Sequence, residues 1–217
     1  MSLTPELAPL KRRWTVKSLI VSGAVVVLLA AMVLDTRVVQ IGSADDVQDA
    51  KFSPEAYGAT EFPRIQALIE GRAVDAATLA AAIAADKVAA TTQYGMPAGT
   101  APVFSVSFTG VVGEGKSGIY KVAVAGLPPE LLVRVQTGPA INGTELRDAT
   151  GTIEFSHFTN QIEYQDAGSA LNNQVKALVL APVDTKALTG KTITVTGSFR
   201  LVNPKSWLVT PVRLAVQ

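Results

Sequence analysis

The chain has 217 residues, enough for one good-sized domain plus additional segments, and 48% of them are hydrophobic, which is high for a soluble protein. It contains no cysteine, which excludes both disulfide bonds and a lipid-modified cysteine. Residues 38–217 carry 14 basic and 16 acidic side chains, and this net charge of −2 argues against a nucleic-acid partner.

An apolar segment near the N-terminus accounts for much of the hydrophobic excess. Residues 18–34 carry no charge before Asp35, and extending the segment back to Trp14 gives about 20 residues, the length that a helix needs to cross a bilayer. More basic residues precede the segment than follow it, which places the N-terminus in the cytoplasm by the positive-inside rule. The sequence therefore predicts a cytoplasmic tail over 1–13, a single transmembrane helix over 14–34 and a polar tether over 35–50.

A cleavable signal peptide is the alternative to this anchor. Signal cleavage needs a small-x-small site just after the apolar core, but here the core runs into Met32, Val33 and Leu34. The small residues Gly42, Ser43 and Ala44 lie too far downstream. We therefore expect an uncleaved anchor in the cytoplasmic (inner) membrane, with the C-terminal domain in the periplasm or outside the cell.

Residues 51–97 have the composition of a helical segment. Ser53 followed by Pro54 is a helix N-cap signal, while Gly58 and Pro63 predict that this first helix is short or broken. A second, alanine-rich helix is predicted over 76–90, with Asp75 as its cap. Leu79 and Ile83 lie one turn apart on it, and its small side chains suit close packing on a neighbour.

From residue 98 onward the pattern favours strands. Apolar and polar residues alternate over 103–111, and further strands are predicted over 119–124 and 131–135. Residues 113–118 read G-E-G-K-S-G, but they lack the spacing of a phosphate loop and are expected to form a hairpin turn. The alternation predicts that the following side chains are buried: Phe104, Val106, Phe108, Val122, Val124, Ile193 and Val195.

The remaining elements complete the predicted barrel. Short strands are expected around Ile153 and Phe155 and around Ile162, followed by a helix over 167–180 whose inward face holds Leu171, Val175 and Leu178. Two last strands are expected over 192–201 and 207–216. Three strands, a helix and two strands is the order of an OB-fold, so the fold class is mainly β with helices (α+β), an OB-like Greek-key β-barrel over 98–217.

No catalytic or metal-binding constellation is evident. His157 is the only histidine, and the nearby carboxylates do not have the spacing of metal ligands. No serine lies in a nucleophile-elbow pattern. We therefore expect a protein that is not an enzyme and needs no cofactor.

A polar segment after the third strand is the best candidate for recognition. It lies where apolar periodicity stops, as expected of a binding loop. Its candidate partner-binding residues are Gln136, Thr137, Asn142, Arg147 and Asp148. The alternative is an internal salt bridge that pins a structural loop. A ligand site would instead use Trp207 and Tyr164, although Trp207 also suits a buried anchor of the last strand.

Several short motifs together resemble a bacterial family of predicted periplasmic lipoproteins with no assigned function. These motifs are F-S-P-E-A-Y-G from Phe52, Q-Y-G from Gln93, V-Q-T-G-P-A-I-N-G-T from Val135 with L-R-D-A-T-G from Leu146, F-T-N-Q-I-E-Y from Phe158, and G-S-F from Gly197. The resemblance implies an OB-like barrel outside the cytoplasmic membrane and a frequent gene association with sugar ABC transporters. The chain departs from the lipoprotein pattern because it has no cysteine, so an uncleaved helix would replace the lipid anchor.

Three functions follow as hypotheses. The leading one is a membrane-anchored, non-enzymatic accessory or scaffold protein that contacts an envelope partner, such as subunits of a sugar ABC transporter. The second is a periplasmic small-molecule binder, with carbohydrate as the ligand. The third is an OB-type oligonucleotide binder, which a basic groove lined by exposed aromatic side chains would favour.

Overall fold

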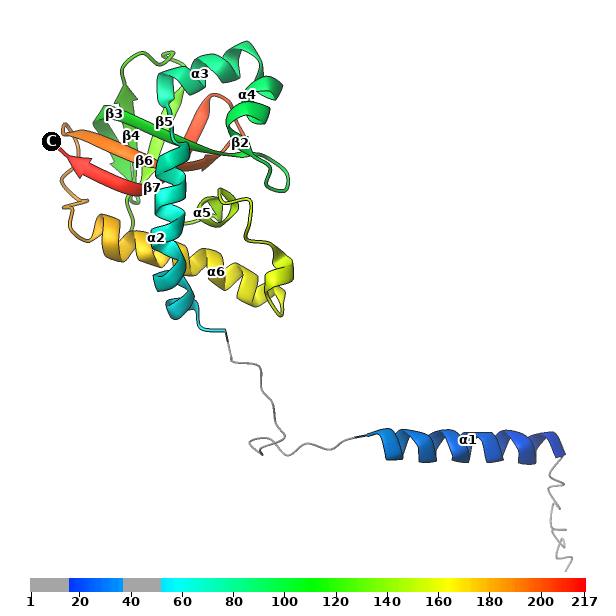
Figure 1. Cartoon of the computed structure of the whole chain (residues 1–217). Coiled ribbons are helices and arrows are strands. Elements are labelled where there is room, and N and C mark those ends of the chain that lie inside the picture. The colour runs from blue at the N-terminus through cyan, green and yellow to red at the C-terminus, as the bar shows by residue number, and fades with distance from the viewer. Residues whose placement is uncertain (1–15, 37–51) are drawn as a thin grey trace, which may run out of the picture. The chain divides into compact units, whose positions relative to one another are not determined.

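The computed structural model describes residues 16–36 and 52–217 (Figure 1). The predicted cytoplasmic tail over 1–13, Trp14 and nearly all of the tether lie outside the described residues. The chain divides into two units, one ending at Lys51 and the other running from Phe52 to Gln217. Each unit is described by itself.

The first unit contains one described helix, α1 (Val16–Asp35). Its 20 residues match the thickness of a bilayer, and none of its side chains is buried against protein. Among the described residues, α1 is the one helix long and apolar enough to cross a membrane, a test that N-terminal signal sequences also pass. The predicted apolar helix is therefore confirmed.

The second unit begins with α2 (Pro54–Arg72), which is longer than the sequence predicts. Ser53 caps it, accepting a hydrogen bond from the Ala56 amide. The prediction of a break at Gly58 or Pro63 is wrong. Pro63 lies on the exposed face, whereas Gly58 packs so closely on α6 that an added Cβ would lie 3.0 Å from the carbonyl oxygen of Ala170. Packing of the buried face, which holds Phe62, Ile65 and Ile69, keeps the helix continuous despite the missing proline N–H.

The predicted alanine-rich helix is two helices, α3 (Ala76–Ala85) and α4 (Lys87–Tyr94). Asp86 divides them, because its carboxylate accepts hydrogen bonds from the amides of Val88 at 2.8 Å and Ala89 at 3.0 Å and so caps a new helix. Asp75 caps α3 as predicted. Leu79 and Ile83 are buried, which confirms that α3 is a packing helix.

Seven strands form one sheet, and five of them close it into a barrel. The closed set is β3 (Val103–Lys116), β4 (Ile119–Val124), β5 (Leu132–Gln136), β7 (Ser206–Val216) and β6 (Thr192–Arg200), with β6 pairing back to β3. All these pairs are antiparallel except β5 with β7. The short strands β1 (Val74–Asp75) and β2 (Gly95–Met96) add to β3. This is the predicted OB-type barrel.

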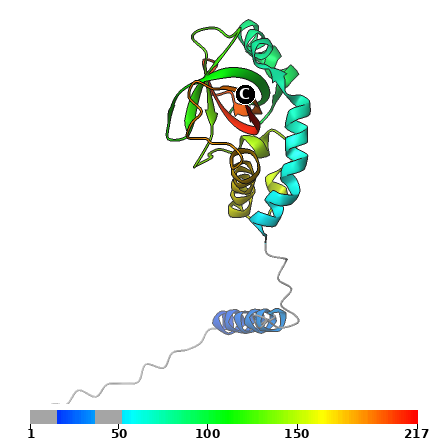
Figure 2. The same ribbon diagram turned by 90° about the vertical axis from the view of Figure 1, so that its left-hand side faces the viewer.

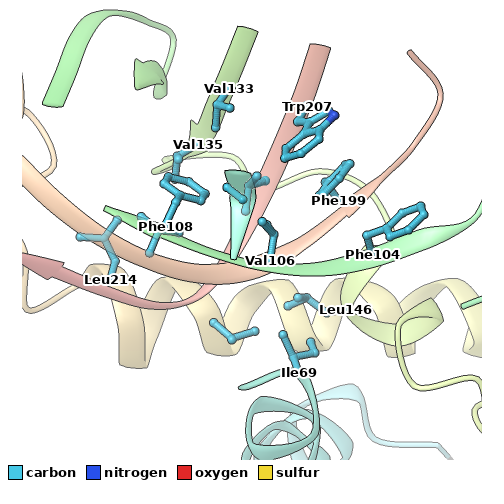
Figure 3. Close-up of a cluster of buried hydrophobic side chains, with 14 of the residues drawn as sticks. Ile69, Phe104, Val106, Phe108, Val133, Val135, Leu146, Phe199, Trp207 and Leu214 are labelled. Carbon is cyan, nitrogen blue, oxygen red and sulfur yellow. The ribbon is translucent and has the colours of Figure 1, made fainter. Parts of the chain in front are cut away.

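The barrel core follows the predicted alternation. Of the seven side chains expected inside, six are buried and Val124 is half-buried. Phe104, Phe199 and Trp207 stack in series, with ring centroids 5.8 and 4.5 Å apart (Figure 3). Residues of α2 and α3 belong to the same core, so these helices and the barrel fold as one body.

The segment between β5 and β6, which the structure describes in full, consists of helices and loops and contains no strand. It contains α5 (Glu145–Asp148), a 3₁₀ turn (Phe155–His157), α6 (Gln161–Gln174) and a π-helix (Val175–Leu180). The strands predicted around Phe155 and Ile162 are therefore wrong. Asn160 decides the second case, because its side chain accepts hydrogen bonds from the Ile162 and Glu163 amides and starts α6 there.

The predicted helix over 167–180 is confirmed, although it begins earlier and its last turn is wider than an α-helix. In the π-helix the amide of Ala181 donates to the carbonyl of Lys176, five residues back, at 2.9 Å. This wider turn rotates the following side chains, so Leu178 is exposed while Val179 and Leu180 are buried. The prediction that Leu178 faces inward is wrong for this reason.

Two ends of the barrel are covered by different helices. Both views place α3 and α4 at the end opposite to α6, with α2 running along one side between them (Figures 1 and 2). The segment from α5 to the start of α6 therefore lies apart from α3. Three of the candidate site residues, Arg147, Asp148 and Tyr164, lie in this segment.

Candidate functional site

A pocket of about 650 Å³ opens between four segments of the chain. These are the loop before β3, α5 with the residues that follow it, the start of α6, and the end of β6. Its lining residues are Pro97, Ala98, Gly99, Thr100, Arg147, Asp148, Gly151, Ile153, Glu154, Phe155, Tyr164 and Arg200. We call it the Arg147 pocket. Three residues that the sequence singled out, Arg147, Asp148 and Tyr164, meet in it.

An ionic network forms the floor of the pocket. The Asp148 carboxylate accepts a hydrogen bond from Arg147 Nε at 2.8 Å on one oxygen and from Arg200 Nη2 on the other. Thr144 Oγ1 donates to the same carboxylate at 2.7 Å. The side chains of Arg147, Asp148 and Arg200 are only 6, 11 and 19% exposed, so all three charges are largely removed from water. Such a network requires every member, because a buried charge without its partner is costly.

The two guanidiniums also hold separate backbone segments together. Arg147 Nη1 donates to the carbonyl of Tyr164 at 2.8 Å, which ties α5 to α6. Arg200 Nη1 donates to the carbonyls of Ala98 at 2.6 Å and Ala101 at 3.0 Å, which ties β6 to the loop before β3. The network therefore positions the walls of the pocket.

A half-buried glutamate adjoins this network. Glu145 Oε1 lies 3.9 Å from Arg200 Nε. Burial raises the pKa of the Glu145 carboxyl above its ordinary value, although the Arg200 charge acts in the opposite direction.

Five aromatic rings form a continuous row behind and beside the network. In spatial order they are Phe52, Tyr57, Phe158, Tyr164 and Phe155, and each ring centroid lies 5.4 to 5.8 Å from the next. The Arg147 guanidinium lies over the Tyr164 ring at 3.6 Å from its centroid, a cation–π contact. At the outer end of the row, Phe155 lines the pocket and remains 49% exposed.

Burial also affects the tyrosine near the inner end of the row. It raises the pKa of the Tyr57 hydroxyl above its ordinary value, and the charge of Glu61 adds to this effect. Tyr57 therefore stays neutral over the physiological pH range, as expected of a ring that packs in a structural row.

The candidate partner-binding residues do not form one surface. Gln136 and Thr137 are buried, and their side chains bond within the domain, Gln136 Nε2 to Thr210 Oγ1 at 2.8 Å and Thr137 Oγ1 to the carbonyl of Gly118 at 3.1 Å. Asn142 is exposed, and its backbone N–H donates a hydrogen bond to Gln136 Oε1. Direct partner contact through Gln136 and Thr137 is therefore contradicted.

Arg147 and Asp148 follow the alternative interpretation of the segment. Arg147 is only 5% exposed, and its Nε and Nη1 donate to acceptors inside the domain. An internal salt bridge pins the loop, so presentation of this guanidinium to a protein partner is contradicted. The two residues form the floor of a pocket and do not protrude from the surface as contacts for a protein partner.

The two residues of the ligand-binding alternative, Trp207 and Tyr164, differ in their burial. Trp207 is fully buried and stacks on Phe199, so no ligand can lie on its ring, and its role as a ligand platform is wrong. It is the buried anchor of the last strand, and it is one of the residues that line a small apolar cavity of about 180 Å³. Tyr164, in contrast, is half-buried and lines the Arg147 pocket.

Two residues of the pocket, Arg200 and Phe155, were not predicted as site residues from the sequence. Arg200 lies at the end of a strand, and nothing local distinguishes it from an ordinary surface cation. Phe155 was noticed but assigned to a strand. A better signal was available in the clustering of Phe155, Phe158 and Tyr164 after a polar loop, which is unusual for a solvated segment.

Metal ligands do not gather in the part of the chain that the structure describes. Among residues 16–36 and 52–217, no group of three or more His, Cys, Asp or Glu side chains lies close enough to hold a metal ion. His157 is exposed at the end of the 3₁₀ turn.

Comparison with solved structures supports the fold. An OB-fold protein from Thermotoga maritima, known from its crystal structure, superposes with a TM-score of 0.61 over 76% of this chain and 99% of that chain. The sequence identity is 19%, so this likeness shows the fold and not the function. No curated protein matches the chain.

Comparison with family models supports the resemblance seen in the sequence. Three of the motifs that carry it, from Phe52 to Tyr57, Leu146 to Gly151 and Phe158 to Tyr164, contribute residues to the Arg147 pocket or its aromatic row. A model of predicted periplasmic lipoproteins, a family designated a domain of unknown function, matches residues 23–215. The chain therefore belongs to this family of predicted periplasmic lipoproteins.

Proposed function

We propose that this protein is a membrane-tethered, non-enzymatic envelope protein that binds a neutral polar small molecule, of the carbohydrate class, in the Arg147 pocket. The observation that carries the proposal is the combination of a charge-balanced polar floor with an exposed aromatic side chain at the rim. A volume of about 650 Å³ is within the range of small-molecule sites.

Charge balance favours a neutral ligand over an ionic one. The charged side chains that line the pocket are two cations, Arg147 and Arg200, and two anions, Asp148 and Glu154. Their formal charges therefore cancel. An anion would lose its hydration without meeting net positive charge, and a cation would meet two guanidiniums. Hydroxyl groups, in contrast, can both donate to carboxylates and accept from guanidiniums.

The aromatic wall favours a ligand with an apolar face. Phe155 is 49% exposed and is supported from behind by Tyr164, with the ring centroids 5.8 Å apart. Sugar rings present C–H groups on one face and hydroxyls around the edge, which matches an aromatic side chain beside a polar floor. The domain thus offers both kinds of contact within one pocket.

We expect Phe155→Ala to weaken carbohydrate binding about tenfold without lowering the melting temperature by more than a degree or two, because an exposed ring contributes contact area and little stability. Calorimetric titration of the full-length protein in detergent with ribose, xylose, glucose, galactose and maltose measures this. Ile162→Ala is the matched control, since Ile162 is a large exposed apolar residue that does not line the pocket.

Two results would contradict the proposal. One is that no sugar of the panel binds the wild-type protein. The other is that a sugar binds Phe155→Ala as tightly as the wild type, which would place its site elsewhere. Equal weakening by Ile162→Ala would point to a general effect on the fold.

The second candidate function is the accessory role, in which the domain contacts subunits of a sugar ABC transporter. One specific observation favours it. Ile162 lies on the first turn of α6, close in sequence to Phe155, and it is 72% exposed. Exposing a large apolar side chain to water costs free energy, which a partner surface would recover. Both candidates place the domain in the periplasm. They can coexist if the pocket serves the transported sugar.

Tethering by α1 rests on its length, its apolar composition and the absence of a cysteine that could carry a lipid. We expect the mature protein to retain Trp14 and to purify with the membrane fraction in detergent, together with transporter subunits. Mass spectrometry of the purified protein and of its companions tests both points. A mature N-terminus near Asp45 would refute the anchor, and recovery of the protein alone would refute the stable partner.

A further inference from the structure

A second groove lies on the outer face of the barrel, where the β3–β4 hairpin meets β5. It has a volume of about 680 Å³. Its lining residues are Glu114, Gly115, Lys116, Ser117, Ile119, Lys121 and Arg134. None of these residues lines the Arg147 pocket. We call it the Lys121 groove.

Two cations face each other across the strands of this groove. Lys121 on β4 is the direct register partner of Arg134 on β5, so both side chains leave the same face of the sheet at the same level. The neighbours Tyr120 and Val122 point the other way, towards the core. Like charges directly opposite each other in an antiparallel pair are destabilising, and sequences normally avoid them.

Nearby acidic groups do not neutralise this pair. Glu114 is the one carboxylate among the lining residues, its contact with Lys121 is long at 3.8 Å, and its side chain is 91% exposed. A contact of this kind adds little to stability. With Lys116, Lys121 and Arg134 against Glu114, the lining side chains carry a net charge of +2.

Arg134 itself is held in place but has no described counter-charge. Its Nη2 donates to Ser206 Oγ at 3.0 Å, which holds the side chain in place. Its Nε is buried and has no acceptor among the described residues, and no described carboxylate forms a salt bridge with it. Arg147 and Arg200, in contrast, share Asp148. Within the described part of the chain, Arg134 is thus a fixed guanidinium that lacks a counter-charge.

We propose that the Lys121 groove binds an anion of the phosphate class, either a soluble phosphate ester or the headgroup of an anionic lipid. The Arg134 guanidinium can donate paired hydrogen bonds to two oxygens of such a group, while the Lys116 and Lys121 ammonium groups neutralise its charge. An anion bound between Lys121 and Arg134 would attract both cations and so offset the repulsion between them. This site is separate from the carbohydrate pocket and does not depend on it.

The groove differs from a nucleic-acid site in one respect. Single-stranded nucleic acids bind to OB-folds through a basic path and exposed aromatic rings on which bases stack. Among its lining residues the Lys121 groove has no aromatic side chain. Recognition of a phosphate group alone therefore fits better than recognition of an oligonucleotide.

The variant Lys121→Glu tests the proposal because it replaces the repulsive pair by an attractive one. Without any anion, it should raise the melting temperature of the full-length protein in neutral detergent by about 1–4 °C. Pyrophosphate at roughly ten times its dissociation constant should raise the melting temperature of the wild-type protein by about 3–6 °C, and that of Lys121→Glu not at all. Lys176→Glu, an exposed lysine on the π-helix, is the matched control and should respond like the wild type.

Two kinds of membrane separate the sources of the phosphate group. In nanodiscs of phosphatidylcholine, pyrophosphate should stabilise the protein if a soluble ester is the ligand. In nanodiscs with phosphatidylglycerol, a higher initial melting temperature that pyrophosphate no longer raises would identify a lipid headgroup. Either pattern supports the proposal, provided that Lys121→Glu abolishes it.

Two outcomes would overturn the proposal. The first is an equal response of the wild type and Lys121→Glu to pyrophosphate, or no response of the wild type in any of the three media. The second is a single-stranded oligonucleotide that binds more tightly than pyrophosphate and competes with it, because an oligonucleotide site would then occupy the groove.

Discussion

Asp148→Ala is expected to lower the free energy of unfolding by about 3–5 kcal/mol, since it strands two buried cations at once. Both carboxylate oxygens of Asp148 are used, one by Arg147 and the other by Arg200. Neither guanidinium can move into water without releasing the backbone carbonyls that it also holds. Equilibrium unfolding in urea, followed by circular dichroism, measures the loss.

Asp166→Ala is the control for this variant. Asp166 is half-buried on α6, but no hydrogen bond or ion pair is described for it, so its removal should cost less than about 1 kcal/mol. A similarly small loss for Asp148→Ala would mean that the network does not hold the fold together. The pocket floor would then be an arrangement of mobile surface charges.

Trp207→Ala is expected to cost about 3–5 kcal/mol, because it removes the largest fully buried side chain of the domain and leaves a cavity in the barrel. The Trp207 ring stacks on Phe199, and its backbone pairs with Val133 on β5. The same urea titration measures the effect. Figure 3 shows how the ring lies among the other core side chains.

Trp207→Phe separates cavity formation from hydrogen bonding. The indole Nε1 is buried and has no acceptor among the described residues, so phenylalanine loses no hydrogen bond. The smaller cavity should cost about 1–2 kcal/mol. A loss as large as that of Trp207→Ala would show that Nε1 has an acceptor, such as a bound water, and would contradict this assignment.

Strand alternation made the barrel predictable. The predicted inward residues of β3 are buried, and from Ser107 onward the opposite face is half-exposed or exposed, whereas both faces are buried over residues 103–106. Three strands, a helix and two strands then suffice to recognise an OB-fold, because few closed sheets have that order. The pattern is local, so it can be read from the sequence.

Elements decided by tertiary contacts were not predictable in the same way. The helix α2 continues through Pro63 because its other face packs on α6, and no local signal contains that information. Around Ile162, apolar residues two apart suggested a strand, but the Asn160 cap and the buried small residues Ala167 and Ala170 stabilise a helix. Here the side-chain cap outweighs the short alternating pattern.

The candidate site was predicted in part for a similar reason. Arg147 and Asp148 stood out because they are charged where apolar periodicity stops, and they do lie in a pocket. Their burial depends on Arg200, which lies at the end of β6 and is remote in sequence. Whether a charged pair faces water or a third charge depends on the fold. The role of Arg147 and Asp148 could therefore not be predicted from the sequence.

The closing pair of strands, β3 and β6, has a consequence for the order in which the protein forms. Val103 pairs with Arg200 and Val111 with Thr192, so the whole segment between them must be available before the barrel can close. Contacts of such long range slow folding, because the chain loses much entropy before they form. The apolar helix α1 is made long before β6, and it needs no other part of the chain to satisfy its backbone. Under the proposed tethering, insertion of α1 precedes closure of the barrel during synthesis, and β3 is meanwhile an open edge that must be kept from pairing with other chains.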